Sequence, residues 1–197
     1  MPFRKSREPK IDSRGSASLL AFAIMTAAEV FESVTNGGSK DFSALVRILN
    51  ANQPWCLIGG LAVNCYVEPI YTLDADIVVM TDRLSQISKQ LERAEFQIQK
   101  FEHSIDAKGQ QSQLRIQFTT GVRYQEFLSD KKEHEVLGQR VPVASLDNVI
   151  RGKIWAWKDQ TWRTSKRKKE SWTCFRSSKL YPKLREKIPP EIVEQLK

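Results

Sequence analysis

The chain has few of the residues that form disulfide frameworks or zinc clusters. Its 197 residues include three cysteines and two histidines, and no two cysteines form a Cys-x-x-Cys pair. Cys56, Cys65 and Cys174 are widely spaced, and Cys56 lies in an apolar stretch. We therefore expect buried free thiols, no zinc site and the reducing environment of the cytoplasm.

The sequence also lacks an apolar run long enough to cross a bilayer, so we expect no membrane partner. An uncharged stretch at 15–28 follows a basic tail, an arrangement that superficially matches a secretory signal. Apolar residues continue at helical spacing past Glu29 and Glu32 as far as Val34. This periodicity favours an amphipathic helix ending at Asn36, with a signal peptide as the alternative.

Charge is distributed unevenly along the chain. Residues 15–150 carry 12 Lys and Arg against 16 Asp and Glu, whereas residues 151–187 carry 13 Lys and Arg against three acids. The net charge of +8 is thus concentrated near the C-terminus. Such an excess indicates a polyanionic partner, RNA before a membrane, and the alternative is a solvated basic helix.

Hydrophobic periodicity predicts an α+β fold. We divide the chain into a flexible basic tail (1–14), a domain of residues 15–145, and a basic helical segment (146–197) packed on that domain. Residues 103–113 are polar and contain a glycine, so we expect a loop there. Further helices are expected over 41–50, 82–96, 146–159 and 163–175, and strands over 55–58, 71–80, 96–101 and 113–120, with a strand pair or turn at 136–145.

Two neighbouring elements near the middle carry the chemistry. Gly59 and Gly60 end a buried strand and begin a helix, a place where backbone N–H groups converge on an anion. Asp74 and Asp76 are two residues apart in the next strand, so their carboxylates share one face about 7 Å apart. Paired carboxylates repel unless a cation lies between them, and oxygen ligands favour Mg²⁺ or Mn²⁺. The pattern predicts a phosphate cradle beside a metal site.

Gly59-Gly60, thirteen further residues and then Asp74-Ala75-Asp76 together resemble the signature of the nucleotidyltransferase superfamily, which has the DNA-polymerase-β-like fold. The segments GGLAVN and YTLDADIVV are most similar to minimal nucleotidyltransferases, including abortive-infection (type IV toxin) relatives. The resemblance implies a mixed β-sheet flanked by helices. It also implies that Asp74 and Asp76 are catalytic metal ligands and that Gly59 and Gly60 hold the β- and γ-phosphates of an NTP.

In that family a third carboxylate on a following strand holds a second ion and helps to deprotonate the attacking hydroxyl. Here the matching strand is QLRIQFTT, and Gln117 occupies the position, or Arg115 if the register slips. Neither residue can act as an anionic ligand. Four acids lie nearby in the sequence without a spacing that favours any of them: Glu102, Asp106, Glu126 and Asp130.

The C-terminal part, VPVASLDNVIRGKIWAWKD followed by KRKKESWT, is also similar to that of these relatives. Lys153 matches a helix lysine expected near the nucleotide phosphates, and Lys169 matches a second one. Glu170 and Thr173 stand where the relatives have aspartates, so one acidic position is conservatively changed and another is lost.

The basic segment suggests how RNA would bind. Lys166, Arg167 and Lys168 are the expected phosphate-binding cations, and Trp157, four residues after Lys153, is a candidate for stacking a base. We expect Trp155 and Trp172 to fasten the C-terminal helices to the rest of the protein.

The sequence favours a transferase that uses Mg²⁺ or Mn²⁺ to move NMP from an NTP onto an RNA end, tRNA by resemblance, or onto a protein hydroxyl. The family likeness suggests a toxin–antitoxin or phage-defence setting. The missing carboxylate supports a second hypothesis, a nucleotide-binding or partner-binding protein of this fold without turnover. A third, an aminoglycoside-type small-molecule transferase, predicts an acidic acceptor cleft, and the basic excess argues against it. The nucleotide and the oligomeric state are left open.

Overall fold

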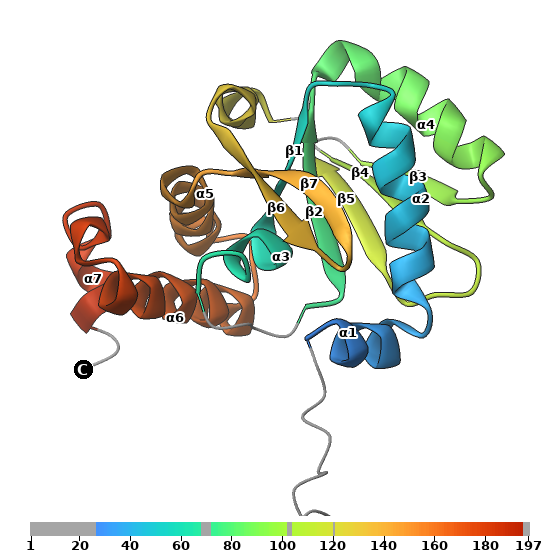
Figure 1. Cartoon of the computed structure of the whole chain (residues 1–197). Coiled ribbons are helices and arrows are strands. Elements are labelled where there is room, and N and C mark those ends of the chain that lie inside the picture. The colour runs from blue at the N-terminus through green and yellow to red at the C-terminus, as the bar shows by residue number, and fades with distance from the viewer. Residues whose placement is uncertain (1–26, 68–71, 102–103, 120, 195–197) are drawn as a thin grey trace, which may run out of the picture.

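The computed structural model describes residues 27–67, 72–101, 104–119 and 121–194, shown as the coloured ribbon in Figure 1. The expected basic tail (1–14) and the first part of the expected N-terminal helix lie outside these residues. The helix α1 (Ala27–Thr35) is the described remainder of that helix.

A seven-stranded sheet forms the centre of the protein, in the order β3-β4-β5-β2-β1-β7-β6. The pairs β2–β5 and β1–β7 are parallel and the other pairs are antiparallel, so the sheet is mixed. The expected α+β class is confirmed. The strands are β1 (Trp55–Ile58), β2 (Asp74–Val79), β3 (Gln97–Lys100), β4 (Ser104–Lys108), β5 (Arg115–Thr119), β6 (Lys131–Val136) and β7 (Gln139–Ala144).

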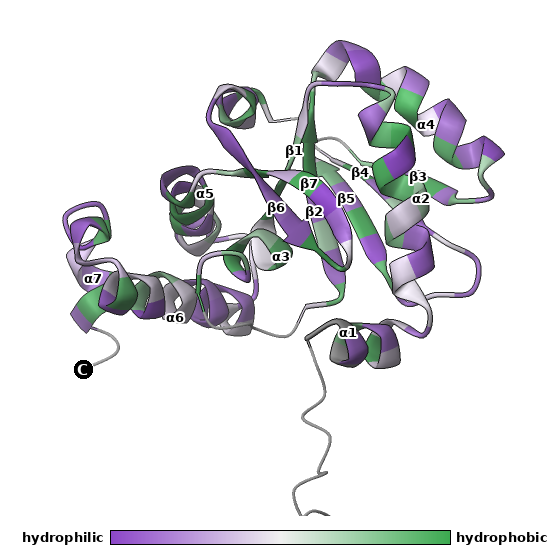
Figure 2. Cartoon of the chain, in the orientation of Figure 1, coloured by the Kyte–Doolittle hydropathy of each residue, from purple (hydrophilic) through white to green (hydrophobic). Residues whose placement is uncertain are grey.

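Helices cover both faces of this sheet. In Figure 1, α2 (Gly38–Asn50) and α4 (Leu84–Arg93) lie on one side, and α5 (Leu146–Lys158) and α6 (Thr164–Leu180) lie on the other. Figure 2 shows hydrophobic and hydrophilic residues alternating along α2 and α4, as expected of helices with one buried side. The shorter helical elements are α3 (Gly59–Val63), η1 (Thr81–Arg83), η2 (Val122–Ser129), η3 (Pro182–Leu184) and α7 (Pro190–Glu194).

The apolar side chains form two clusters. The larger joins the sheet to α2 and α4, and includes the fully buried Trp55, Phe42 and Phe118. A smaller cluster joins α5, α6, η3 and α7 and is made of Ile150, Ile154, Cys174, Leu184, Ile188 and Ile192. The C-terminal helices therefore have an apolar contact of their own, which holds α6 in place beside α5.

The strand β1 ends where the two sequence motifs meet. It is a short apolar run, and its register with β2 places Ile58 opposite Asp76. Because Gly59 directly follows Ile58, the Gly-Gly turn begins beside the second aspartate of the Asp-x-Asp pair. The proximity of the two motifs is thus a consequence of antiparallel strand pairing.

Residues 103–113 do not form the single loop that their polarity predicts. Ser104–Lys108 form β4, which pairs with both β3 and β5. The segment alternates, with Ile105 and Ala107 buried and Asp106 between them on the opposite face. A strand with only two apolar residues shows too little alternation of apolar and polar residues to be predicted from the sequence.

Two other boundaries differ from expectation. The helix expected from Asp41 begins at Gly38, with Gly37 at the N-cap, and Asp41 instead accepts a hydrogen bond from Ser112. The segment expected to hold a strand pair or turn is a hairpin whose first strand starts earlier, at Lys131. Leu137 and Gly138 both have positive φ at its tip, as a tight hairpin turn requires.

No helix among the described residues combines the length and the apolar character that a membrane span needs. Cys56, Cys65 and Cys174 are free thiols, and Cys56 and Cys174 are buried. The expectation of a buried thiol is therefore confirmed for Cys56, whereas Cys65 is only half-buried.

Candidate active site

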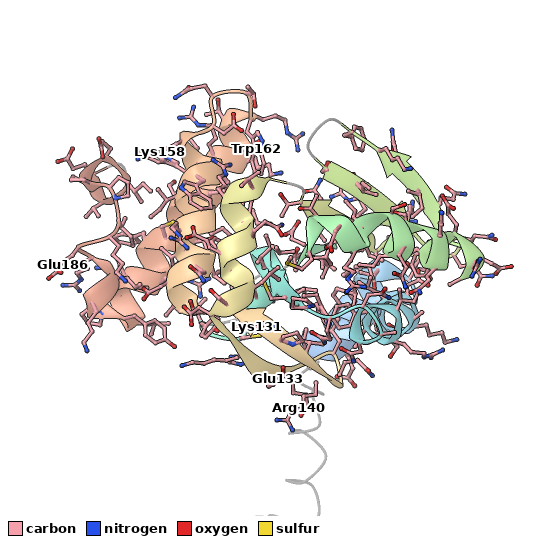
Figure 3. The ribbon with its side chains drawn as sticks, turned by 90° about the horizontal axis from the view of Figure 1, so that it is seen from above. Lys131, Glu133, Arg140, Lys158, Trp162 and Glu186 are labelled. Atoms are coloured by element: carbon pink, nitrogen blue, oxygen red, sulfur yellow. The ribbon has the colours of Figure 1, made fainter. Side chains whose placement is uncertain are left out.

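A cavity of about 1030 Å³ lies between the sheet and the α5–α6 pair, and we call it the central cavity. Figure 3 shows Trp162, one of its wall residues, at the end of the α5–α6 pair far from the β6–β7 hairpin. The charged and polar walls of the central cavity include Asp74, Asp76, Asp106, Arg115 and Gln117 from the sheet, and Arg123, Lys153, Asp159, Trp162, Arg163, Lys166, Lys169 and Glu170 from the helical side.

Asp74 and Asp76 both line the central cavity, as their shared strand face predicts. Asp74 pairs with Arg115, whose Nη2 lies 2.9 Å from its Oδ1. Asp76 lies deeper, and burial raises its pKa from the ordinary 3.8 to about 6; Lys153 lowers this pKa and the neighbouring Asp74 raises it. The two carboxylates therefore differ in how readily they carry charge in the free protein.

Gly59 is packed directly against Asp76. Its φ of +72° is a conformation that side chains rarely adopt, and a Cβ at this position would overlap the Asp76 carboxylate. A Cβ on Gly60 would come within 2.9 Å of the Thr72 hydroxyl. Glycine is thus required at residue 59 by both its backbone conformation and the lack of space, whereas residue 60 is limited only by the nearby Thr72 side chain.

Lys153 and Glu170 join α5 to α6 at the wall of the central cavity. Their charged groups are 2.8 Å apart, and both side chains are almost fully buried. Burial lowers the pKa of Lys153, but the Glu170 carboxylate beside it more than offsets this effect, and the net direction is upward. Lys153 is therefore a fixed cation between α6 and Asp76.

The expected RNA-binding residues occupy different positions. Lys166 lines the central cavity with its Nζ 3.3 Å from the centre of the Trp162 ring, and partial burial lowers its pKa. Arg167 donates from Nε to the Trp157 carbonyl at 2.8 Å, so it fastens α6 to the end of α5. Lys168 is exposed and lies outside the cavity lining.

Trp157 also lies outside the cavity lining, where it packs against the smaller apolar cluster. The aromatic residue that reaches the central cavity beside a lysine is Trp162. Sequence reasoning did not single out Trp162, although its spacing of four residues from Lys166 was a usable signal. Lys169, expected to bind nucleotide, lines the cavity as well.

Trp155 and Trp172 were both expected to fasten the C-terminal helices to the rest of the protein, and only Trp155 does so. Trp155 stacks on Phe127 with ring centres 5.7 Å apart, and the Arg123 guanidinium lies over the Trp155 ring at 4.7 Å from its centre, so Trp155 fastens α5 to η2 as expected. Trp172 is 48% exposed and stacks on Phe175 of the same helix. The expectation that Trp172 fastens the C-terminal helices is therefore wrong, because its side of α6 faces solvent.

The register of three strands places Gln117 and Asp106 beside the aspartates. Asp76 lies opposite Gln117 across the β2–β5 pair, and Gln117 lies opposite Asp106 across the β5–β4 pair. The Gln117 amide donates from Nε2 to Asp106 Oδ1 at 3.1 Å. Gln117, rather than the alternative Arg115, thus lies next to Asp76 at the position that the resemblance implies for a third carboxylate, and Asp106 lies one strand further on.

The structure does not place Glu126 or Asp130 where either could substitute for the third carboxylate. Glu126 pairs with Arg151 at 3.0 Å, and Asp130 does not line the central cavity. Glu102 lies outside the described residues. Within the described part of the chain, no group of three or more His, Cys, Asp or Glu side chains is arranged to hold a metal ion. A bound metal would therefore have two protein carboxylates, Asp74 and Asp76.

Two carboxylates fit the requirements of Mg²⁺. This ion is commonly held by one or two carboxylates, with waters and substrate phosphates supplying the other ligands. The packing of Gly59 against Asp76 keeps side-chain atoms away from the mouth of this pair, and Lys153 and Lys166 supply positive charge across the cavity. The donor set suits a metal that arrives together with a polyphosphate.

Comparisons with known proteins agree with this geometry at the level of the fold. No family model and no curated protein matches the sequence. The solution structure of the antibiotic-resistance factor ANT(2″)-Ia matches with a TM-score of 0.55 and 11% identity, covering 78% of this chain and 94% of that one. ANT(2″)-Ia in complex with adenylyl-2″-tobramycin gives 0.52 and 13%, covering 76% and 98%.

A third solved structure is an antigenic nucleotidyltransferase-like protein from Paracoccidioides brasiliensis, with a TM-score of 0.50 and 15% identity over 75% of this chain and 78% of that one. The protein therefore has the nucleotidyltransferase fold, which confirms the resemblance seen in the sequence. At these identities the likeness concerns the fold alone, and the activity must be argued from the site.

The raised pKa of Asp76 predicts how stability changes with pH. The folded-state pKa lies above the unfolded value, so the free energy of unfolding should rise as pH falls through about 6 toward 4. Asp76→Asn removes this charge, and should stabilise the metal-free protein at pH 7.5 by an amount on the order of 1–3 kcal/mol. Urea unfolding in chelator at pH 7.5 and 4.5 measures both effects, and the gain should shrink at the lower pH.

The matched control is Asp82→Asn, which alters an exposed aspartate in η1. It should leave the free energy of unfolding nearly unchanged at both pH values. A loss of stability in Asp76→Asn at pH 7.5 would show that the Asp76 charge is not a cost in the folded protein.

Proposed function

We propose that this protein transfers a nucleoside monophosphate from an NTP to a hydroxyl group of an acceptor, with Mg²⁺ or Mn²⁺ held by Asp74 and Asp76. The observation that supports this most is the packing of Gly59 on Asp76 at one side of the central cavity, opposite Lys153, Lys166 and Lys169. A pair of carboxylates facing several cations across a large cavity suits a metal–triphosphate complex.

Each part of the NTP has residues of suitable chemistry. The metal, when bound, neutralises charge on the phosphates during in-line displacement at the α-phosphorus. Gly59 and Gly60 present backbone rather than side chain toward the phosphates. Lys153, fixed by Glu170, and Lys169 add positive charge near the leaving pyrophosphate. Trp162 offers an aromatic face for the base, with Lys166 beside it.

The charge of the cavity wall favours an anionic acceptor. Arg123, Arg163, Lys166 and Lys169 line the cavity on the helical side, and Lys168 lies exposed next to them. An RNA end, such as that of a tRNA, suits this surface, and a protein hydroxyl is the other acceptor in keeping with the proposal. The sequence resemblance to abortive-infection relatives suggests a toxin–antitoxin or phage-defence setting.

A small-molecule acceptor has one argument in its favour, the matched structure that contains adenylyl-2″-tobramycin. A cationic sugar would bind on the acidic sheet wall, where Asp74 is already paired with Arg115. It would face Arg123, Arg163, Lys166 and Lys169 across the cavity, with Asp159 as an acid there and Glu170 paired with Lys153. The charge pattern therefore ranks this acceptor below RNA.

The second candidate function is binding without turnover. It is favoured by one observation, the neutral Gln117 opposite Asp76 where a third carboxylate would complete a two-metal site. The central cavity would then hold a nucleotide as a ligand. Transfer and binding make different predictions for the same experiment.

Label transfer distinguishes them. The protein is incubated with each α-³²P-NTP and Mg²⁺ or Mn²⁺, together with total tRNA or total cell protein. We expect label in one acceptor class from one nucleotide, and none from the Asp74→Asn/Asp76→Asn variant, because two carboxylates that bind the metal are removed. Asp82→Asn should transfer label like the wild type.

Calorimetric titration with Mg²⁺ and a non-hydrolysable NTP completes the test. Metal-dependent binding without label transfer in any combination would support the binding protein and contradict the transferase. Unchanged metal-dependent affinity in the double variant would contradict the assignment of Asp74 and Asp76 as ligands.

The basic segment predicts a salt dependence of RNA binding. Lys166→Gln/Lys168→Gln/Lys169→Gln should weaken binding, and should reduce the slope of log K against log[salt] by about 2 for single-stranded RNA. Arg167 is left unchanged because it holds α6 to α5. Fluorescence anisotropy over a salt series measures the slope.

Lys131→Gln/Lys132→Gln is the matched control. Lys131 lies on the β6–β7 hairpin, away from Trp162 and Lys158 in Figure 3, and neither lysine lines the central cavity. Its salt slope should equal that of the wild type. Equal slopes for all three proteins would mean that RNA does not contact the basic segment.

A further inference from the structure

Three polar side chains form a row across the cavity face of the sheet. In-register pairs on neighbouring strands point to the same face, so Asp76 of β2, Gln117 of β5 and Asp106 of β4 lie side by side. All three line the central cavity. With a spacing of about 4.8 Å per strand, the backbones of Asp76 and Asp106 are roughly 10 Å apart. The Gln117 side chain lies between the two carboxylates and donates to Asp106.

Asp106 contacts an uncharged group, whereas two other acids of the cavity form ion pairs. Asp74 is paired with Arg115, and Glu170 with Lys153. Asp159 accepts hydrogen bonds from the backbone amide and the hydroxyl of Thr161. The partner of Asp106 among the described residues is the neutral amide of Gln117, which orients one carboxylate oxygen without neutralising the charge.

We propose that Asp106 is the general base of the transfer reaction and that Gln117 positions it. This inference rests on the proposed function. The acceptor hydroxyl lies over Gln117, between Asp76 and Asp106. Its oxygen bonds to the α-phosphorus while its proton passes to Asp106. The bond from the α-phosphorus to the bridging oxygen breaks, and that electron pair leaves with pyrophosphate. Asp106 afterwards releases the proton to water.

A carboxylate at residue 117 would both hold a second metal ion and help to take the proton of the acceptor hydroxyl. Here Asp106 performs only the second of these tasks. A neutral Gln117 adds no negative charge beside Asp74 and Asp76, and no third carboxylate is close enough to them to complete a second metal site in the described chain. The acceptor is then activated by a side chain rather than by a second ion. We expect one Mn²⁺ per chain with a bound NTP analogue.

The test compares Asp106→Asn with the wild type. The variant is close in shape and keeps an oxygen for the Gln117 amide, so it should fold. Loss of a general base lowers kcat by about 10²–10³-fold, while the KM for NTP should change less than about threefold. Gln117→Ala should lower kcat by a smaller factor, and Asp82→Asn should leave it unchanged.

Metal binding gives an independent readout. Mn²⁺ titration followed by electron paramagnetic resonance, with a non-hydrolysable NTP present, should show one bound ion of equal affinity in the wild type and in Asp106→Asn. The exchanged variant Asp106→Asn/Gln117→Asp places the carboxylate next to Asp76, and should bind a second ion and recover part of kcat.

Four outcomes decide the proposal. A large loss of kcat in Asp106→Asn with unchanged Mn²⁺ binding supports it. Unchanged kcat in that variant overturns it while the proposed function stands. Loss of Mn²⁺ binding in that variant also overturns it, because Asp106 would then be a ligand. Absence of transfer by the wild type, with every nucleotide and acceptor, overturns the inference and the proposed function together.

Discussion

The close packing of Gly59 against the Asp76 carboxylate is the constraint on which the candidate site depends. Antiparallel pairing of β1 and β2 places Ile58 opposite Asp76, so the residue after β1 must lie beside the carboxylate. Only glycine combines the positive φ with the missing Cβ that this position requires. One strand pairing thereby produces a turn that exposes backbone and an acidic pair at the edge of the same cavity.

The opposite wall depends on a second contact, the buried pair of Lys153 and Glu170. Removal of one partner from such a pair costs about 3–5 kcal/mol, because the other charge is left buried and unpaired. The pair fixes α6 relative to α5, and Arg167 fastens the same two helices at the end of α5. Lys166 and Lys169 are held facing the aspartates as a result, which gives the cavity one acidic and one basic side.

The sequence predicted the parts of this site that depend on local pattern. The region from β1 to β2 combines an apolar strand, a Gly-Gly turn and two aspartates, Asp74 and Asp76, spaced two residues apart. Each of these features is a pattern of only a few consecutive residues. The resemblance implied Gln117, or Arg115 with a slipped register, at the position of a third carboxylate, and the pairing of β2 with β5 places Gln117 opposite Asp76. The location of Asp106 was not predicted, because its strand is short and polar and its place is set by pairing with β5. Tertiary packing likewise decides that Trp162 rather than Trp157 reaches the cavity.

We propose that Asp74 and Asp76 hold a divalent metal together with a nucleoside triphosphate beside Gly59. Anomalous diffraction from crystals grown with Mn²⁺ and a non-hydrolysable NTP tests it most directly. We expect one manganese peak in contact with both carboxylates, with the phosphates next to Gly59 and Gly60. Manganese elsewhere, or a nucleotide bound in the central cavity with no metal at the aspartates, would contradict the account.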